Sequence, residues 1–143
     1  MARVKGDKIR RPALPYRRIV VKFGTSLLTA GTNQLSEEQM ANLTAQVAQL
    51  HQQGVGLVIV SSGAIAAGRH KLGLTQKLKG IPYKQVLASV GQGRLMNVYE
   101  RLFAPYNITV AQALLTRADL SERAGYLNAR NTLLALLDFR VVG

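Results

Sequence analysis

A lysine followed closely by a glycine and two hydroxyl residues is the first feature of this sequence that could do chemistry. Lys22 precedes Gly24, Thr25 and Ser26, and it ends the apolar run 19–21. A β-branched run of this kind favours a strand that is buried on both faces. Glycine lets the backbone approach a ligand closely, and a lysine beside hydroxyl and N–H donors suits a phosphate. The spacing is not that of a complete P-loop, so these residues alone also fit a solvated lysine beside an ordinary turn.

A second turn repeats this composition. Residues 56–60 form another apolar run, which is followed by Ser61, Ser62, Gly63 and Ala64 and by further small residues up to position 68. The N-terminus of a helix offers free N–H groups and a partial positive charge to an anion. Small side chains also allow a neighbouring helix to pack tightly, and these residues alone do not separate the two interpretations.

The elements that must position these turns follow from capping signals and periodicity. Ser36 begins an S-x-x-Q capping box before apolar residues at helical spacing, and Gly54 stands where a helix-ending glycine belongs. The sequence predicts a helix between them. The remaining expected elements are a loop over 27–35, a helix over 83–103, a strand over 108–115, a last helix and a strand that begins at Arg140. The glycines at 91 and 93 need a reason to stand inside a helix, such as close packing of a partner helix. The last helix is expected to be capped by Ser121, with Leu127, Leu134 and Leu137 facing inward.

Strands that alternate with helices predict an α/β fold, a three-layer sandwich with a mainly parallel sheet. Three strands end in polar turns, so we expect one composite site at a single edge of the sheet. His51 and His70 lack the spacing of a metal pair, and no metal site is predicted. We interpret Tyr106 and Tyr126 as packing residues.

Composition narrows the class of protein. The 143 residues are 48% hydrophobic, as in ordinary globular proteins, and no apolar run approaches the ~18 residues of a transmembrane helix. The N-terminal residues lack the apolar region of a secretory signal. The chain contains no cysteine, which excludes disulfides and fits a reducing compartment. We therefore expect a cytoplasmic protein with no membrane partner.

Half of the net charge of +12 lies in residues 1–18, which hold seven lysines and arginines and one aspartate. Pro12 and Pro15 argue against a continuous helix there. The sequence predicts a flexible basic arm over 1–17, followed by a domain over 18–143. Nucleic-acid binding by the arm is the less favoured interpretation, and the simpler one is a solvated extension.

Five motifs, taken in order, resemble the N-terminal part of the glutamate 5-kinases in the amino acid kinase superfamily. The motifs are residues 20–26, 61–69, 90–96, 114–119 and 126–132. The first is shared across the superfamily, whereas the second, third and fourth together are far more specific. The resemblance extends over residues 18–142 and identifies 18–143 as the N-terminal part of an amino acid kinase domain.

This resemblance implies ATP-dependent phosphorylation of the γ-carboxylate of L-glutamate, the first step of proline synthesis. It also implies ATP and Mg²⁺ as cofactors, proline as a feedback inhibitor and a homo-oligomeric assembly. The resemblance implies that Lys22 binds the ATP phosphates and stabilises the transferring phosphoryl group, and that Gly24, Thr25 and Ser26 line the ATP phosphates. It implies that Ser62, Gly63 and Ala64 bind glutamate. It places Asp119 near the glutamate and proline site.

Two departures from the family pattern qualify these expectations. Gly143 stands where the family usually has proline, and the family's nucleotide-binding half and second lysine lie beyond the matched motifs. We therefore expect residues 1–143 alone to be weakly active or inactive. The alternatives are a non-catalytic fragment or regulatory module that binds glutamate, proline or a full-length kinase subunit, and a sibling kinase with another substrate.

Overall fold

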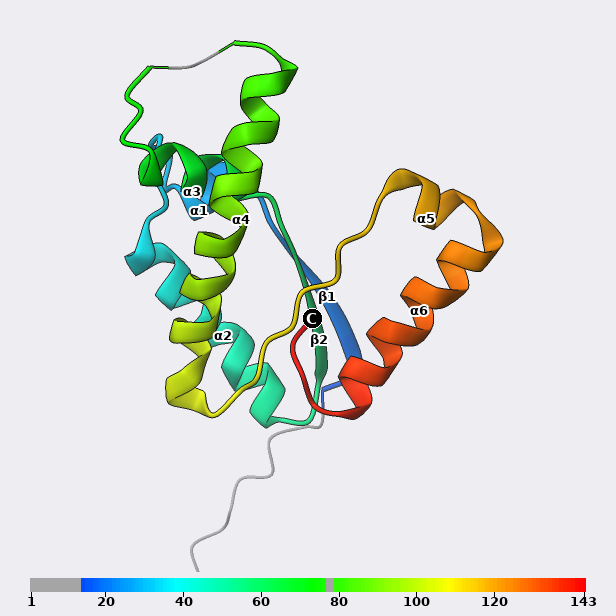
Figure 1. Ribbon diagram of the computed structural model, residues 1–143. Coiled ribbons are helices and arrows are strands. Elements are labelled where there is room, and N and C mark those ends of the chain that lie inside the picture. The colour runs from blue at the N-terminus through cyan, green and yellow to red at the C-terminus, as the bar shows by residue number, and fades with distance from the viewer. Residues whose placement is uncertain (1–13, 77–78) are drawn as a thin grey trace, which may run out of the picture.

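The computed structural model describes residues 14–76 and 79–143, so most of the basic arm predicted over 1–17 lies outside the described residues (Figure 1). Helices and parallel strands alternate along the chain, which confirms the α/β class. The elements are β1 (Arg18–Phe23), α1 (Thr25–Leu28), α2 (Glu37–Gln52), β2 (Gly56–Ser61), α3 (Ala64–Lys71), α4 (Ile81–Phe103), the 3-10 turn η1 (Ala104–Tyr106), α5 (Arg117–Ser121) and α6 (Arg123–Asp138).

The two strands form a parallel sheet in a register that runs from Arg18 opposite Gly56 to Phe23 opposite Ser61. Helices α2, α3 and α4 lie on one side of this sheet and α6 lies on the other, which gives the predicted three layers (Figure 1). The core lies mainly between the sheet and α2 and α4, where Met40, Leu57 and Phe103 are fully buried. No helix in the described part of the chain is both long and apolar enough to cross a membrane.

Helix α2 begins as its capping box predicts. The Ser36 hydroxyl accepts a hydrogen bond from the Gln39 amide at 3.2 Å, and Glu37 and Glu38 occupy the first turn. Gly54 follows the helix with a φ of +93°, a conformation that side-chain-bearing residues rarely adopt. The residues that cap this helix were therefore identified correctly from the sequence.

Helices α3 and α4 approach so closely that their contact requires glycine. A Cβ atom on Gly91 would overlap the Ala64 carbonyl, and one on Gly68 would overlap the Leu87 carbonyl. A Cβ on Gly93, in contrast, would meet no atom within 4 Å. The predicted packing reason is confirmed for Gly91, and Gly93 has no such reason.

The predicted burial of β1 on both faces is wrong. Val20 is 70% exposed, whereas Val21 and Phe23 point towards the core. On the outer face α6 packs against β2, where Leu137 lies beside Gly56. The outer face of β1 is therefore left largely uncovered within the described residues.

The strand predicted over 108–115 and the strand predicted from Arg140 are also wrong as continuous strands. The two segments meet in a single parallel bridge between Val110 and Val142. Arg140 has a φ of +61°, a left-handed conformation that an extended strand does not contain. Residues 112–115 have no strand partner in the described structure, and Leu114 is 77% exposed.

The predicted boundaries of two other segments need correction. The short helix α1 (Thr25–Leu28) includes the first two residues of the predicted loop over 27–35. Ser121 does not cap the last helix, because it is the final residue of α5, and Glu122 is the N-cap of α6. The signal that was missed is Thr116, whose side chain caps α5.

The packing predicted for the last helix holds only in part. Leu134 and Leu137 are half-buried, but Leu127 is exposed. Tyr106 packs against the core as predicted, whereas Tyr126 is half exposed and is not a packing residue. Helix α6 therefore carries more apolar side chains than the described part of the chain buries.

Candidate functional site

The two polar turns predicted to share one edge of the sheet are in direct contact. The hydroxyl oxygens of Thr25 and Ser62 lie 3.1 Å apart, and the Thr25 hydroxyl also lies within 3.2 Å of the Ser62 carbonyl. The register explains this contact, since Phe23 and Ser61 are opposite each other at the ends of parallel strands. The structure thus brings together the first and second chemical motifs of the sequence.

Lys22 lies beside these turns at the end of β1, opposite Val60 of β2. Its side chain is exposed and alternates with Val21 and Phe23, so it lies on the outer face of the sheet. The only ion pair in residues 14–76 and 79–143 joins Arg101 to Glu37 at 2.7 Å. Among these residues no carboxylate neutralises Lys22, and its charge can be offered to an anion.

Gly24 and Gly63 have different reasons to be glycine. A Cβ on Gly24 would meet no atom within 4 Å, so the surface over this turn is open to a ligand. A Cβ on Gly63 would come within 2.9 Å of the Leu28 side chain and 3.2 Å of the Leu95 side chain. Packing alone therefore accounts for Gly63, while the open space at Gly24 fits a phosphate group.

The N-terminus of α3 follows the second turn. Gly63 is its N-cap and provides no side-chain hydrogen bond, and Ala64 is its first residue. The free N–H groups of the first turn and the helix dipole favour a negative charge at this end. The carbonyl of Ala64 lies against Gly91 of α4, so the tight-packing interpretation of the small residues is confirmed at this position, and the anion-binding interpretation stays a prediction.

Asp119 is used as a helix cap. The hydroxyl and the amide of Thr116 donate to its carboxylate at 2.6 and 2.7 Å, and these hydrogen bonds lower the pKa of Asp119. Figure 1 shows α5 on the opposite side of the strands from α1 and α3. No hydrogen bond or ion pair within the described residues joins Asp119 to Lys22, Thr25 or Ser62.

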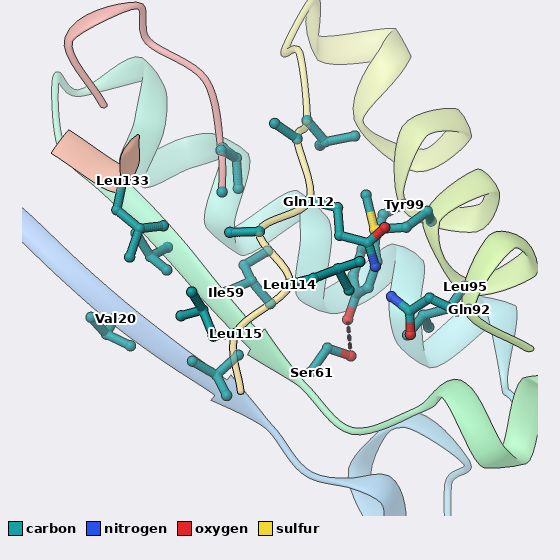
Figure 2. Close-up of a pocket in the computed structure, with 18 of the residues that line it drawn as sticks. Val20, Ile59, Ser61, Gln92, Leu95, Tyr99, Gln112, Leu114, Leu115 and Leu133 are labelled. Atoms are coloured by element: carbon teal, nitrogen blue, oxygen red, sulfur yellow. Dashed lines mark hydrogen bonds between the residues drawn. The ribbon is translucent and has the colours of Figure 1, made fainter. Parts of the chain in front are cut away.

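A hydrogen bond that the sequence does not predict joins Tyr99 to Ser61. The Tyr99 hydroxyl donates to the Ser61 hydroxyl at 3.0 Å, which connects α4 to the last residue of β2 (Figure 2). Burial raises the pKa of Tyr99, and the hydrogen bond opposes part of that shift. Helical periodicity indicates that Tyr99 is buried, but its partner comes from another element and has no local signal.

A largely apolar groove of about 530 Å³ adjoins this hydrogen bond. Its walls come from β2, α4 and residues 110–115, and Gln92 and Gln112 add polar groups near Tyr99 (Figure 2). No set of three histidine, cysteine, aspartate or glutamate side chains in 14–76 and 79–143 is arranged to hold a metal ion. The exposed lysine and the open Gly24 turn fit phosphate groups, but no metal ligands can be named.

Residues 17–142 match the amino acid kinase family over nearly the whole chain. The chain belongs to this family. Among curated proteins, this amino acid kinase chain is 58% identical to glutamate 5-kinase of Dehalococcoides mccartyi (strain CBDB1) over 127 residues. The aligned residues make up 89% of this chain and 34% of that protein. It is 60% identical, with the same coverage, to the glutamate 5-kinase of D. mccartyi strain ATCC BAA-2266 / KCTC 15142 / 195.

A relative from a different genus is somewhat less similar to the chain. The chain is 53% identical to glutamate 5-kinase of Pasteurella multocida (strain Pm70) over 126 residues, and these aligned residues make up 88% of this chain and 34% of that protein. The chain therefore spans about a third of the length of the curated relatives that it matches.

Proposed function

We propose that this chain forms the phosphate-binding and glutamate-binding edge of a glutamate 5-kinase. The hydroxyl contact between Thr25 and Ser62 carries this proposal, because it joins the lysine-bearing turn to the turn that precedes α3. The relatives named glutamate 5-kinase support the choice of reaction and substrate. The reaction transfers the γ-phosphoryl group of ATP to the γ-carboxylate of L-glutamate.

In this reaction a carboxylate oxygen of glutamate forms a bond to the γ-phosphorus while the bond from that phosphorus to ADP breaks. The products are γ-glutamyl phosphate and ADP. The attacking carboxylate is already ionised, so no base has to remove a proton. The contribution of the protein is to position the reactants and to offset the charge on the phosphoryl oxygens.

We assign Lys22 as the catalytic residue whose positive charge offsets the negative charge on the transferring phosphoryl group. Gly24, Thr25 and Ser26, of which Thr25 and Ser26 are exposed, line the ATP phosphates in this proposal. Ser62, Gly63 and Ala64 bind glutamate through a hydroxyl and backbone N–H groups. Asp119, in the first turn of α5, is proposed to belong to the segment near the glutamate and proline site.

The wider role follows from the same proposal. Glutamate phosphorylation begins proline synthesis, with proline as feedback inhibitor, in a homo-oligomer that works in the cytoplasm. ATP would be accompanied by Mg²⁺, to which no residue is assigned. Each of these statements depends on the proposed reaction.

The test is a titration of the isotope-labelled chain with ATP and with L-glutamate, followed by NMR. ATP should shift the amide signals of residues 22–26, and glutamate those of residues 62–64. Lys22→Ala should abolish the ATP response. Arg18→Ala is the matched control, since Arg18 lies on the same face of the same strand about 13 Å away, and it should leave both responses intact.

Trapping of γ-glutamyl phosphate as the hydroxamate tests the reaction itself. We expect weak or no turnover by the 143 residues alone, because they span about a third of the relatives. Binding of both ligands without turnover supports the proposal, whereas no response of either turn to ATP or glutamate contradicts it. Robust turnover would support the reaction and refute the need for the remaining two-thirds.

A further inference from the structure

Helix α6 ends in a left-handed turn at Arg140, which has a φ of +61°. The Arg140 amide donates to the Leu137 carbonyl at 3.0 Å, and the Val141 amide donates to the Leu136 carbonyl at 2.9 Å. This is a Schellman motif, in which glycine usually fills the left-handed position, as Gly54 does after α2. A side chain disfavours this conformation, so an arginine needs other contacts to hold it there.

Those contacts come from His51, in the last turn of α2. The His51 Nε2 atom lies 2.9 Å from the Arg140 carbonyl oxygen. The Arg140 guanidinium donates to the His51 carbonyl and lies 3.5 Å from His51 Nδ1. The two residues are 89 positions apart, and they join helices on opposite sides of the sheet whose C-terminal ends lie at the same end of it (Figure 1).

The two partners fix the position of the proton on the His51 ring. A carbonyl oxygen can only accept a hydrogen bond, so Nε2 carries a hydrogen and donates it to Arg140. A guanidinium can only donate, so the Nδ1 atom that faces it carries no hydrogen. In this arrangement the ring is therefore neutral, with its hydrogen on Nε2.

The guanidinium of Arg140 also caps the end of α2. The last carbonyls of a helix lack intrahelical partners and carry a partial negative charge, which a cation stabilises. The His51 carbonyl accepts from both the Gly54 amide and the guanidinium, as its two lone pairs allow. No ion pair within residues 14–76 and 79–143 engages Arg140. The contacts with His51 therefore give a reason for arginine where glycine is usual.

The turn at Arg140 sets the path of the residues that follow it. The Val142 amide donates to the Thr109 carbonyl, and the Ala111 amide donates to the Val142 carbonyl, both at 3.0 Å. On the other side, Gly143 bonds to β2. A different backbone conformation at Arg140 would direct these residues away from both partners, because the backbone dihedrals of one residue orient all that follow.

We propose that His51 and Arg140 form a latch, in which each residue caps the end of the helix that carries the other. The neutral His51 ring, protonated at Nε2, holds the left-handed turn at Arg140. The turn in turn places Val142 between β2 and residues 109–111. The latch does not depend on the proposed kinase reaction.

Amide hydrogen exchange in the full chain, measured by NMR, tests the latch. The Val142 and Ala111 amides report on the segment that the turn positions, and the amides between β1 and β2 are the internal reference. His51→Ala removes the ring. Gln52→Ala is the matched control, because Gln52 is the exposed neighbour of His51 at the end of the same helix.

We expect His51→Ala to speed exchange of the Val142 and Ala111 amides about tenfold, with little change between β1 and β2. Gln52→Ala should leave all these rates as they are. In the double variant with Arg140→Gly, glycine adopts the left-handed turn without help, so protection of Val142 should return even though His51 is absent. This rescue distinguishes a turn held by His51 from a general loss of packing.

The state of the ring is a second readout. At about pH 8, ¹⁵N NMR of the His51 ring should show one neutral tautomer with its hydrogen on Nε2. A hydrogen on Nδ1 would overturn the proposal. Unchanged exchange in His51→Ala would also overturn it, as would equal acceleration at the β1–β2 amides. If His51→Ala fails to fold, the double variant decides, and its failure to fold or to regain protection would overturn the latch.

Discussion

The hydroxyl of Tyr99 lies 3.0 Å from the hydroxyl of Ser61, so the long helix α4 is bonded to the final residue of β2. Ser61 directly precedes Ser62, which contacts Thr25. The candidate site therefore rests on a helix that is distant from it in sequence.

Tyr99→Phe tests this support. The variant keeps the ring and removes one partly buried hydrogen bond, which should lower the free energy of unfolding by about 0.5–1.5 kcal/mol. Urea unfolding followed by circular dichroism measures the change. Tyr83→Phe, at a half-exposed tyrosine on the same helix, should change the free energy of unfolding much less. Equal losses of stability in the two variants would show that the hydrogen bond to Ser61 does not stabilise the fold.

Thr25→Val should separate the two turns without changing the size of the side chain. The variant cannot bond to the Ser62 hydroxyl or carbonyl, and we expect a loss of about 1 kcal/mol together with a shift of the Ser62 amide signal. Thr25→Ser keeps the hydroxyl and should restore both. If Thr25→Ser behaves like Thr25→Val, the methyl group rather than the hydroxyl holds the turns together.

Gly91→Ala and Gly93→Ala form a matched pair on α4. At Gly91 the new methyl group meets the α3 backbone, so we expect a loss of about 1–3 kcal/mol or failure to fold. At Gly93 the space is open, and replacing a helical glycine by alanine should gain about 0.5–1 kcal/mol. Thermal unfolding compares the two, and equal effects of the same sign would contradict the close contact of α3 with α4.

The Asp119 cap should weaken in acid. Hydrogen bonds from Thr116 lower the pKa of this carboxyl, so its contribution is present above the ordinary pKa of aspartate and is lost as the pH falls through the folded-state value. The Thr116 amide signal should follow this titration, with a midpoint below that of an unperturbed aspartate. In Asp119→Asn the titration should disappear, and a Thr116 signal that still moves would assign it to another group.

Local chemistry made part of this structure predictable. The capping box at Ser36, the glycine at position 54 and the apolar periodicity of α2 act within a few residues of one another, and each is seen as predicted. The sequence also predicts the strands β1 and β2 and the contact between the polar turns after them, because parallel strands bring their carboxyl ends to one edge. The family motifs lie within these same elements.

Which segments found a hydrogen-bonding or packing partner depended on how the whole chain folds. A strand exists through hydrogen bonds to another segment, so residues 108–115 are apolar enough for a strand but form a single bridge. For the same reason Val20 is exposed, since its burial depends on a covering layer and not on its own side chain. Asp119 has a capping partner in its own turn, whereas Thr25 and Ser62 meet across 37 residues. Contacts within a turn can be predicted from the sequence, and contacts between distant segments depend on how the whole chain packs.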